Sequence, residues 1–88
     1  MHVTSITYVS VKSIVTYMKF NIRKLANKIR RLRRQQGLTR EKLAFENDLS
    51  KPTITRIERN EFDPKLSTLL KIAQGLDVKI SELLSCLD

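Results

Sequence analysis

Three side chains near the middle of the chain have the chemistry needed to read DNA bases. Lys51, Thr55 and Arg56 lie close together near the start of a predicted helix. Lysine and arginine donate hydrogen bonds to O6 and N7 of guanine, and a threonine methyl can contact the methyl of thymine. The start of such a helix can point into the major groove. The same residues also suit a solvated helix surface, and this segment alone leaves both interpretations open.

The distribution of charge favours a polyanionic partner. The 88-residue chain has 17 Lys and Arg against 9 Asp and Glu, a net charge of +8. Residues 19–42 hold ten basic side chains and one acid, whereas residues 43–88 hold six basic and eight acidic side chains. A positive block on a nearly neutral body is typical of proteins that bind nucleic acid. A solubilising surface is the alternative.

The sequence contains little that could support catalysis or hold a metal. Cys86 is the single cysteine and His2 the single histidine, so an internal disulfide is excluded and a zinc site lacks ligands. We therefore predict that the protein is not an enzyme and needs no cofactor. A lone cysteine fits a reducing, cytoplasmic setting. No stretch reaches the roughly 20 apolar residues that span a bilayer.

Apolar residues at spacings of three and four predict five short helices after residue 20. Gly37 is expected to end the first helix, and Thr39 and Ser50 are expected to cap the second and third. Pro52 is tolerated in a first turn, and Asp63 followed by Pro64 predicts the start of the fourth helix. The residues predicted to form the apolar stripes of the five helices are, helix by helix, Ile22, Leu25, Ile29 and Leu32; Leu43 and Ala44; Ile54 and Ile57; Leu66, Leu69, Leu70, Ala73 and Leu76; and Ile80, Leu83, Leu84 and Leu87.

Residues 1–18 differ from the rest because β-branched and aromatic side chains dominate them, and these favour an extended chain. The segment is a strand paired across a dimer, an arm ordered only on binding, or an extension upstream of a start at Met18. We assign residues 1–20 to an N-terminal arm, strand-like or disordered, and residues 21–88 to one all-α domain. Its second and third helices form a helix-turn-helix unit.

From Ile29 to Leu84 the sequence resembles the phage-repressor and Cro-type (XRE) helix-turn-helix family. The resemblance covers about two-thirds of the chain, and its specificity comes from the order and spacing of the pieces. It implies a five-helix, lambda-repressor-like fold and a transcriptional regulator that reads the major groove of double-stranded DNA with the helix at about 50–59. The matching pieces are residues 29–33, 37–44, 49–59, Pro64, residues 68–73, Leu76, Val78 and residues 81–84.

The resemblance also implies roles for individual positions. Arg33 and Glu58 match an arginine and a glutamate that pair between the first and third helices, so we expect a structural ion pair there. Base-reading positions of the family are occupied by Lys51, Pro52, Thr55 and Arg56. Positions that contact the DNA backbone are occupied by Thr39, Arg40, Ser50, Thr53, Arg59 and Asn60.

The chain departs from the family at three turn positions where glycine is common. These positions hold Asp48, Asn60 and Asp77. Asparagine and aspartate are the other residues that best tolerate a left-handed backbone, so we expect positive φ angles at all three. Pro52 is unusual on a reading surface, and Lys79 replaces a common capping serine, which leaves the start of the fifth helix undefined.

A single recognition helix reads only a few base pairs, so we expect a homodimer on a palindromic operator. Ile80, Leu84 and Leu87 of the fifth helix are candidates for the dimer contact, or they fold back into the monomer core. An alternative function is an antitoxin that uses this domain for autoregulation and has a toxin as its protein partner. A membrane-surface role for the basic residues 22–34 is less favoured, because core packing explains their apolar stripe better, so we predict no membrane partner.

Overall fold

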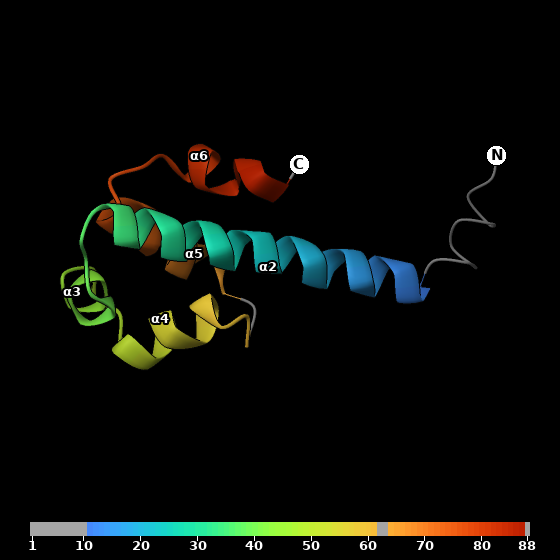
Figure 1. Ribbon diagram of the computed structural model, residues 1–88, viewed down its shortest axis with the longest axis horizontal. Helices are drawn as coiled ribbons and strands as arrows, with labels where there is room; N and C mark the ends of the chain where they lie inside the picture. The colour runs from blue at the N-terminus through green and yellow to red at the C-terminus, as the bar shows by residue number, and fades with distance from the viewer. Residues whose placement is uncertain (1–10, 62–63, 88) are drawn as a thin grey trace.

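All regular secondary structure in the described part of the chain is helical. The computed structural model describes residues 11–61 and 64–87, with side chains described from residue 21, and it contains no strand in these ranges. The predicted all-α architecture is confirmed (Figure 1). The elements are α2 (Val11–Gln35), α3 (Arg40–Phe45), α4 (Lys51–Glu58), α5 (Leu66–Gly75), α6 (Ile80–Leu84) and the short 3-10 helix η1 (Ser85–Leu87).

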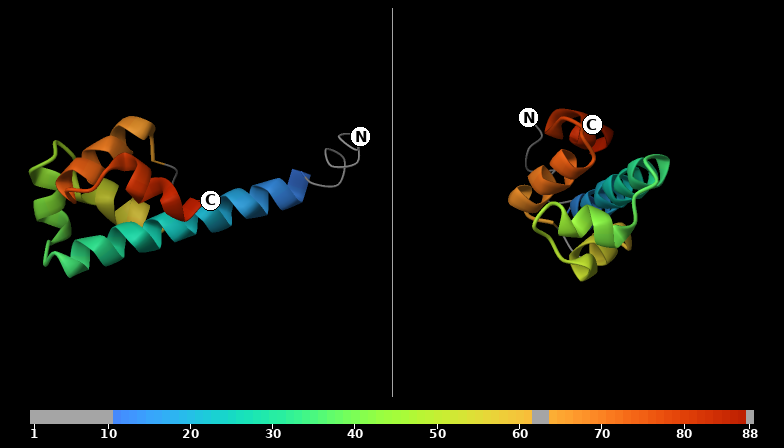
Figure 2. Two further views of the ribbon diagram at one scale, coloured as in Figure 1. Left: turned by 90° about the horizontal axis from the view of Figure 1, so that it is seen from above. Right: turned by 90° about the vertical axis from the view of Figure 1, so that its left-hand side faces the viewer.

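Helix α2 is much longer than the sequence pattern predicted. Its C-terminal half packs against the other helices, whereas its N-terminal half projects beyond them (Figures 1 and 2). Residues 11–20 therefore continue the first helix. The alternative that they form a strand-like arm is wrong for these residues. Adding residues to an existing helix costs far less than nucleating one, so β-branched side chains do not stop it. Residues 1–10 lie outside the described residues.

Side-chain caps fix where α3 and α4 begin. The Thr39 hydroxyl accepts a hydrogen bond from the Lys42 amide at 3.0 Å, and the Ser50 hydroxyl accepts one from the Thr53 amide at 3.3 Å. Pro52 lies in the first turn of α4, as expected. These local signals are readable from sequence because donor and acceptor are only three residues apart.

The start of α5 corrects the sequence prediction. Lys65 is the extended residue before the helix, with ψ 158°, and it makes no side-chain cap, so the helix begins at Leu66 and not at Pro64. Asp63, the predicted cap, lies outside the described residues. The buried stripe shifts accordingly. Leu66 and Leu70, predicted to face inward, are 61% and 47% exposed, and the buried residues are Leu69, Ile72, Ala73 and Leu76.

An aliphatic core joins all five helices. Ile29 of α2, Leu43 of α3, Ile54 of α4 and Ile72 of α5 are almost fully buried, and Leu83 brings α6 into the same cluster. The Lys28 ammonium donates hydrogen bonds to the Glu82 carbonyl and, at 2.9 Å, to the Ser85 hydroxyl, which hold the C-terminal segment along α2. Helix α4 packs against both α2 and α3, and α3 and α4 lie on the same side of α2 (Figure 1).

Left-handed residues terminate helices and turns at the predicted places. Asp48, Asn60 and Asp77 have φ angles of 58°, 60° and 57°, and Gly37 has 68°. The short polar side chains of aspartate and asparagine lower the cost of this conformation. The three departures from glycine in the sequence therefore preserve the backbone path, including the turn between α3 and α4.

Candidate nucleic-acid interface

The outer surface of α4 gathers the four residues predicted to read bases. Lys51, Pro52 and Arg56 are exposed and Thr55 is half-buried. Together with Arg59 and Glu61, these four residues line an open hollow of about 400 Å³. The opposite side of α4 is anchored by Ile54 and Ile57, which are 0% and 2% exposed. Amphipathicity of this one helix therefore sets which side chains face solvent.

Lys51 has an acidic neighbour across the helix-turn-helix. Its ammonium lies 3.0 Å from Glu41 Oε2, and both side chains are more than half exposed. The hydrogen bond from Lys51, with a backbone hydrogen bond, lowers the pKa of Glu41 below its ordinary value. An exposed pair of this kind contributes little free energy, so the Lys51 ammonium can exchange this partner for a base or a phosphate at small cost.

Glu58 lies beneath the interface and joins α4 to α2. Arg33 Nε donates to Glu58 Oε2 at 2.6 Å and Arg33 Nη2 to Glu58 Oε1 at 3.0 Å, a two-pronged pair between the two residues that the family resemblance matched. A third Arg33 hydrogen bond, at 2.9 Å, reaches the Leu38 carbonyl. The Glu58 side chain is fully buried and that of Arg33 is 10% exposed. Arg33 is thereby held in the structure and does not face solvent.

Arg40 binds the same carboxylate, a contact that sequence reasoning missed. Arg40 Nε donates to Glu58 Oε1 at 3.0 Å, and the side chain stays 27% exposed. Burial raises the pKa of Glu58, but hydrogen bonds from Arg33 and then Arg40 outweigh it, so the pKa lies below the ordinary value. The family resemblance implies only a phosphate contact for Arg40, and no sequence signal links it to Glu58, 18 positions away.

Four of the six predicted backbone-contacting residues, Thr39, Arg40, Ser50 and Thr53, lie at the starts of α3 and α4. Thr39 and Arg40 line a second hollow, of about 370 Å³, together with Arg33, Arg34, Glu41 and Lys51. Ser50 and Thr53 form a hydroxyl pair at 2.8 Å. Arg59 and Asn60 follow at the other end of α4. The structure thus brings all of these residues to the edges of the α4 surface.

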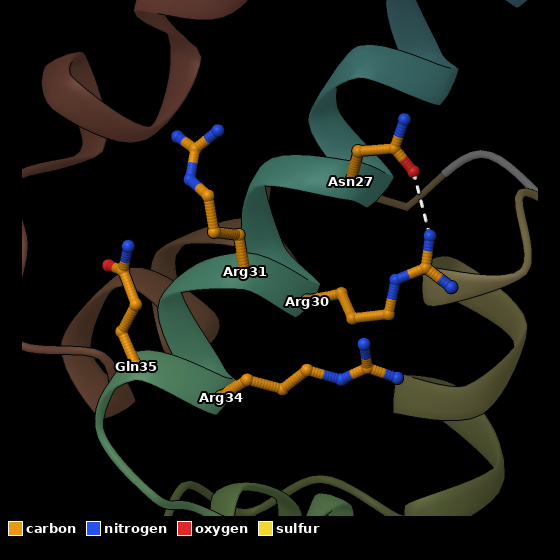
Figure 3. Close-up of a pocket in the computed structure, with 5 residues that line it drawn as sticks. All are labelled: Asn27, Arg30, Arg31, Arg34 and Gln35. Carbon is orange, nitrogen blue, oxygen red and sulfur yellow. Dashed lines mark hydrogen bonds between the residues drawn. The ribbon is translucent and has the colours of Figure 1, made fainter.

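Three arginines outside the predicted set form a further cationic cluster. Arg30, Arg31 and Arg34 line a hollow of about 370 Å³ on α2, with Asn27 and Gln35 (Figure 3). In the sequence these three arginines belong to the basic block of residues 19–42, and no individual role is predicted for any of them. Their spacing of one to four residues was the available signal.

The described residues contain no group of histidine, cysteine, aspartate and glutamate side chains that could hold a metal ion. Among the helices of residues 11–61 and 64–87, none is both long and apolar enough to cross a membrane.

Known proteins share both the sequence and the arrangement of these helices. A family model described as helix-turn-helix matches residues 29–83. The chain is 41% identical over 61 residues to the HTH-type transcriptional regulator SutR of Escherichia coli K12, covering 69% of this chain and 34% of that protein. It is 33% identical over 57 residues to the immunity repressor protein of Bacillus phage phi105, covering 65% of this chain and 40% of the repressor. The chain thus spans about a third of the length of SutR.

A solved structure matches over most of its own length. This is the restriction-modification controller protein C.Esp1396I, a tetramer in complex with its natural 35 base-pair operator. The TM-score is 0.71 and the sequence identity 31%, over 77% of this chain and 90% of that one.

Proposed function

The chain belongs to the phage-repressor and Cro-type (XRE) helix-turn-helix family, and from this premise we propose that it is a sequence-specific regulator of transcription, acting as a repressor on double-stranded DNA. The observation that carries the proposal is the outer surface of α4. One hollow there is lined by Lys51, Pro52, Thr55 and Arg56, while Ile54 and Ile57 bury the opposite side of the helix in the core. The relatives support it: one is named a phage immunity repressor, and one was solved on its operator.

In this proposal α4 lies in the major groove and its exposed side chains read base edges. Arg56 and Lys51 are the long donors suited to guanine O6 and N7, and the Thr55 methyl and the Pro52 ring are suited to apolar contact with thymine. Pro52 has no N–H, so it can make van der Waals contacts with a base but cannot donate a hydrogen bond to it. Sequence preference arises from these four residues together.

Backbone contacts hold α4 in register. The residues proposed to make them flank α4 on both sides: Thr39, Arg40, Ser50, Thr53, Arg59 and Asn60. Arg40 is partly neutralised by Glu58. Its guanidinium has further N–H groups, so it can bind a phosphate while Glu58 fixes its position.

We propose a homodimer on a palindromic operator, because one α4 contacts too few base pairs for specific binding. Ile80, Leu84 and Leu87, the candidate contacts, are half-buried against the core of their own chain. They therefore retain only part of their apolar surface for a second copy. The proposal includes no catalytic activity, and it places the protein in the cytoplasm with the DNA that it binds.

Selection of bound duplexes from a random pool, followed by affinity measurements on an Arg56→Ala variant, tests the proposal. The expected consensus is palindromic. Arg56→Ala should relax preference at one symmetric pair of positions and weaken binding by about 1–3 kcal/mol per half-site. Lys65→Ala removes an exposed cation away from the α4 hollow and is the matched control.

Two results would contradict the proposal. Recovery of no consensus by the wild-type protein would exclude sequence-specific binding. A uniform loss across all sequences in Arg56→Ala would assign Arg56 to the backbone instead of the bases.

A further inference from the structure

A row of arginines runs along α2 beside the helix-turn-helix. Arg23, Arg30 and Arg34 follow one another at spacings of seven and four residues, which places them on one face of a helix. Asn27 lies between them, and its side-chain oxygen accepts a hydrogen bond from Arg30 Nη2 at 2.9 Å. At about 1.5 Å per residue, the row from Arg23 to Arg34 is about 16 Å long.

Among the described residues, no carboxylate forms an ion pair with this row. The sequence has no acidic residue before Glu41. None of the three arginines of the row takes part in an ion pair among the described residues. The cations of those ion pairs are Arg33, Arg40, Lys51 and Lys71. Arg33, directly beside Arg34 in sequence, is fully paired with Glu58. The buried Arg33 is thus compensated, whereas the row stays cationic, with Arg23 and Arg34 exposed and Arg30 half-buried. Like charges that accumulate in this way favour a polyanionic ligand.

The row is continuous with the candidate interface. Arg34 lines the hollow that contains Arg30 and Arg31 and also the hollow that contains Arg40 and Lys51. Lys51 in turn lines the hollow on the outer surface of α4. In Figure 3 the Arg30 and Arg34 side chains extend in the same direction from α2, roughly parallel to each other. Shared lining residues therefore connect the α2 row to the base-reading surface.

We propose that Arg23, Arg30 and Arg34 form a second DNA-backbone site that binds phosphates outside the base pairs read by α4. This inference rests on the proposed function. Guanidinium groups match phosphate oxygens in a planar, two-pronged geometry. A row about 16 Å long can contact several phosphates of a duplex backbone, whereas a compact ligand would reach only one of these arginines or two. The binding is independent of sequence, so it lengthens the footprint without changing the consensus.

The path of α2 supports a flanking position for this site. Helix α2 continues past the globular part of the molecule (Figure 2). Lys12 and Lys19 stand seven residues apart in the extension, and Lys19 precedes Arg23 by four, so their helical positions prolong the same row. A duplex with only the consensus base pairs would leave part of this row without phosphates.

The test compares two duplexes and two double variants. One duplex is trimmed to the consensus selected from the random pool, and the other carries about ten further base pairs, one helical turn, at each end. Arg30→Gln/Arg34→Gln removes two cations of the row and keeps helix-forming side chains. Lys65→Gln/Lys79→Gln removes the same charge from exposed positions before α5 and α6. Circular dichroism spectra are compared with the wild type to check that both variants remain folded.

We expect the wild-type protein to bind the longer duplex about tenfold more tightly than the trimmed one at 0.1 M salt, and Arg30→Gln/Arg34→Gln to lose that gain. The slope of log affinity against log salt on the longer duplex should become shallower by about two in this variant. Ethylation interference should show phosphates outside the consensus in the wild-type protein and not in the variant.

Other outcomes separate this inference from the proposed function. If the wild-type protein selects a consensus but the two double variants behave alike, the α2 site is excluded and the proposed function stands. Equal losses on both duplexes would also overturn the inference, because the arginines would then act within the consensus. If no consensus is selected, the proposed function itself fails.

Discussion

Glu58 is the residue that connects stability with the interface. Its buried carboxylate accepts hydrogen bonds from Arg33 of α2 and Arg40 of α3, and it belongs to α4. One carboxylate therefore joins three helices, and it also holds Arg40, for which we propose a contact with the DNA backbone. Removing a single partner from a buried ion pair leaves an uncompensated charge, which costs about 3–5 kcal/mol.

We expect Glu58→Gln to lower the free energy of unfolding by about 3 kcal/mol at pH 7 and to flatten its pH dependence. The folded-state pKa of Glu58 is below its ordinary value, so its ion pairs contribute fully above the unfolded pKa of about 4.3 and lose that contribution as pH falls through the folded pKa. Urea unfolding of both proteins between pH 7 and pH 3 measures this difference.

Glu41→Gln serves as the control, because Glu41 is exposed and its pair with Lys51 should contribute under about 1 kcal/mol. If Glu58→Gln and the wild-type protein lost stability in parallel on acidification, the role assigned to the Glu58 carboxylate would be wrong.

At the scale of elements, Gly75 shows how closely α3 and α5 pack. A Cβ atom built on Gly75 would lie 2.3 Å from Asn47 Nδ2 and 2.6 Å from Leu43 Cδ1. Asn47 Nδ2 is not free to move away, because it donates to the Leu43 carbonyl at 2.7 Å. The glycine is thus required by a close approach of two helices and not by its own backbone angle.

Gly75→Ala should therefore destabilise the protein by about 1–2 kcal/mol. Alanine is the better helix former by about 1 kcal/mol, but overpacking typically costs about 1–3 kcal/mol and here also disturbs the Asn47 hydrogen bond. Thermal unfolding compared with Gln74→Ala, an exposed position of the same helix, gives the measurement. A variant more stable than wild type would show that α3 and α5 move apart at little cost.

At the scale of the whole molecule, charge is segregated by element. Helix α2 has nine Lys and Arg and no acid, whereas most acidic side chains belong to the second half of the chain. The positive side includes the starts of α3 and α4, where Arg40 and Lys51 lie. Such segregation favours one orientation of approach to a polyanion.

We expect affinity for the selected duplex to fall steeply with salt. Six to ten phosphate contacts would reduce it by about 10³–10⁵ between 50 and 200 mM salt. Fluorescence anisotropy titrations across this range, in a salt with a weakly binding anion, provide the measurement. A nearly constant affinity would mean that the basic side chains do not displace counterions, against the electrostatic basis of the proposed interface.

The sequence by itself determined the features that depend on neighbours within about four residues. The caps at Thr39 and Ser50, the left-handed backbone at Asp48, Asn60 and Asp77, and the amphipathic pattern of α4 all rest on such short-range contacts. The family resemblance added the pairing of Arg33 with Glu58, which lie 25 residues apart. The order of the helices and the candidate reading surface were therefore predictable.

Tertiary structure decided what depends on residues distant in sequence. Arg40 pairs with Glu58 because α3 and α4 are brought together around a buried carboxylate. Leu66 and Leu70 are exposed, although their spacing favours burial, because core contacts select Leu69, Ile72 and Leu76 instead. The α2 arginines connect to the candidate interface only through Arg34, which lines a hollow together with Arg40 of α3 and Lys51 of α4. Spacing along a helix defines its faces, but only packing decides which face is covered.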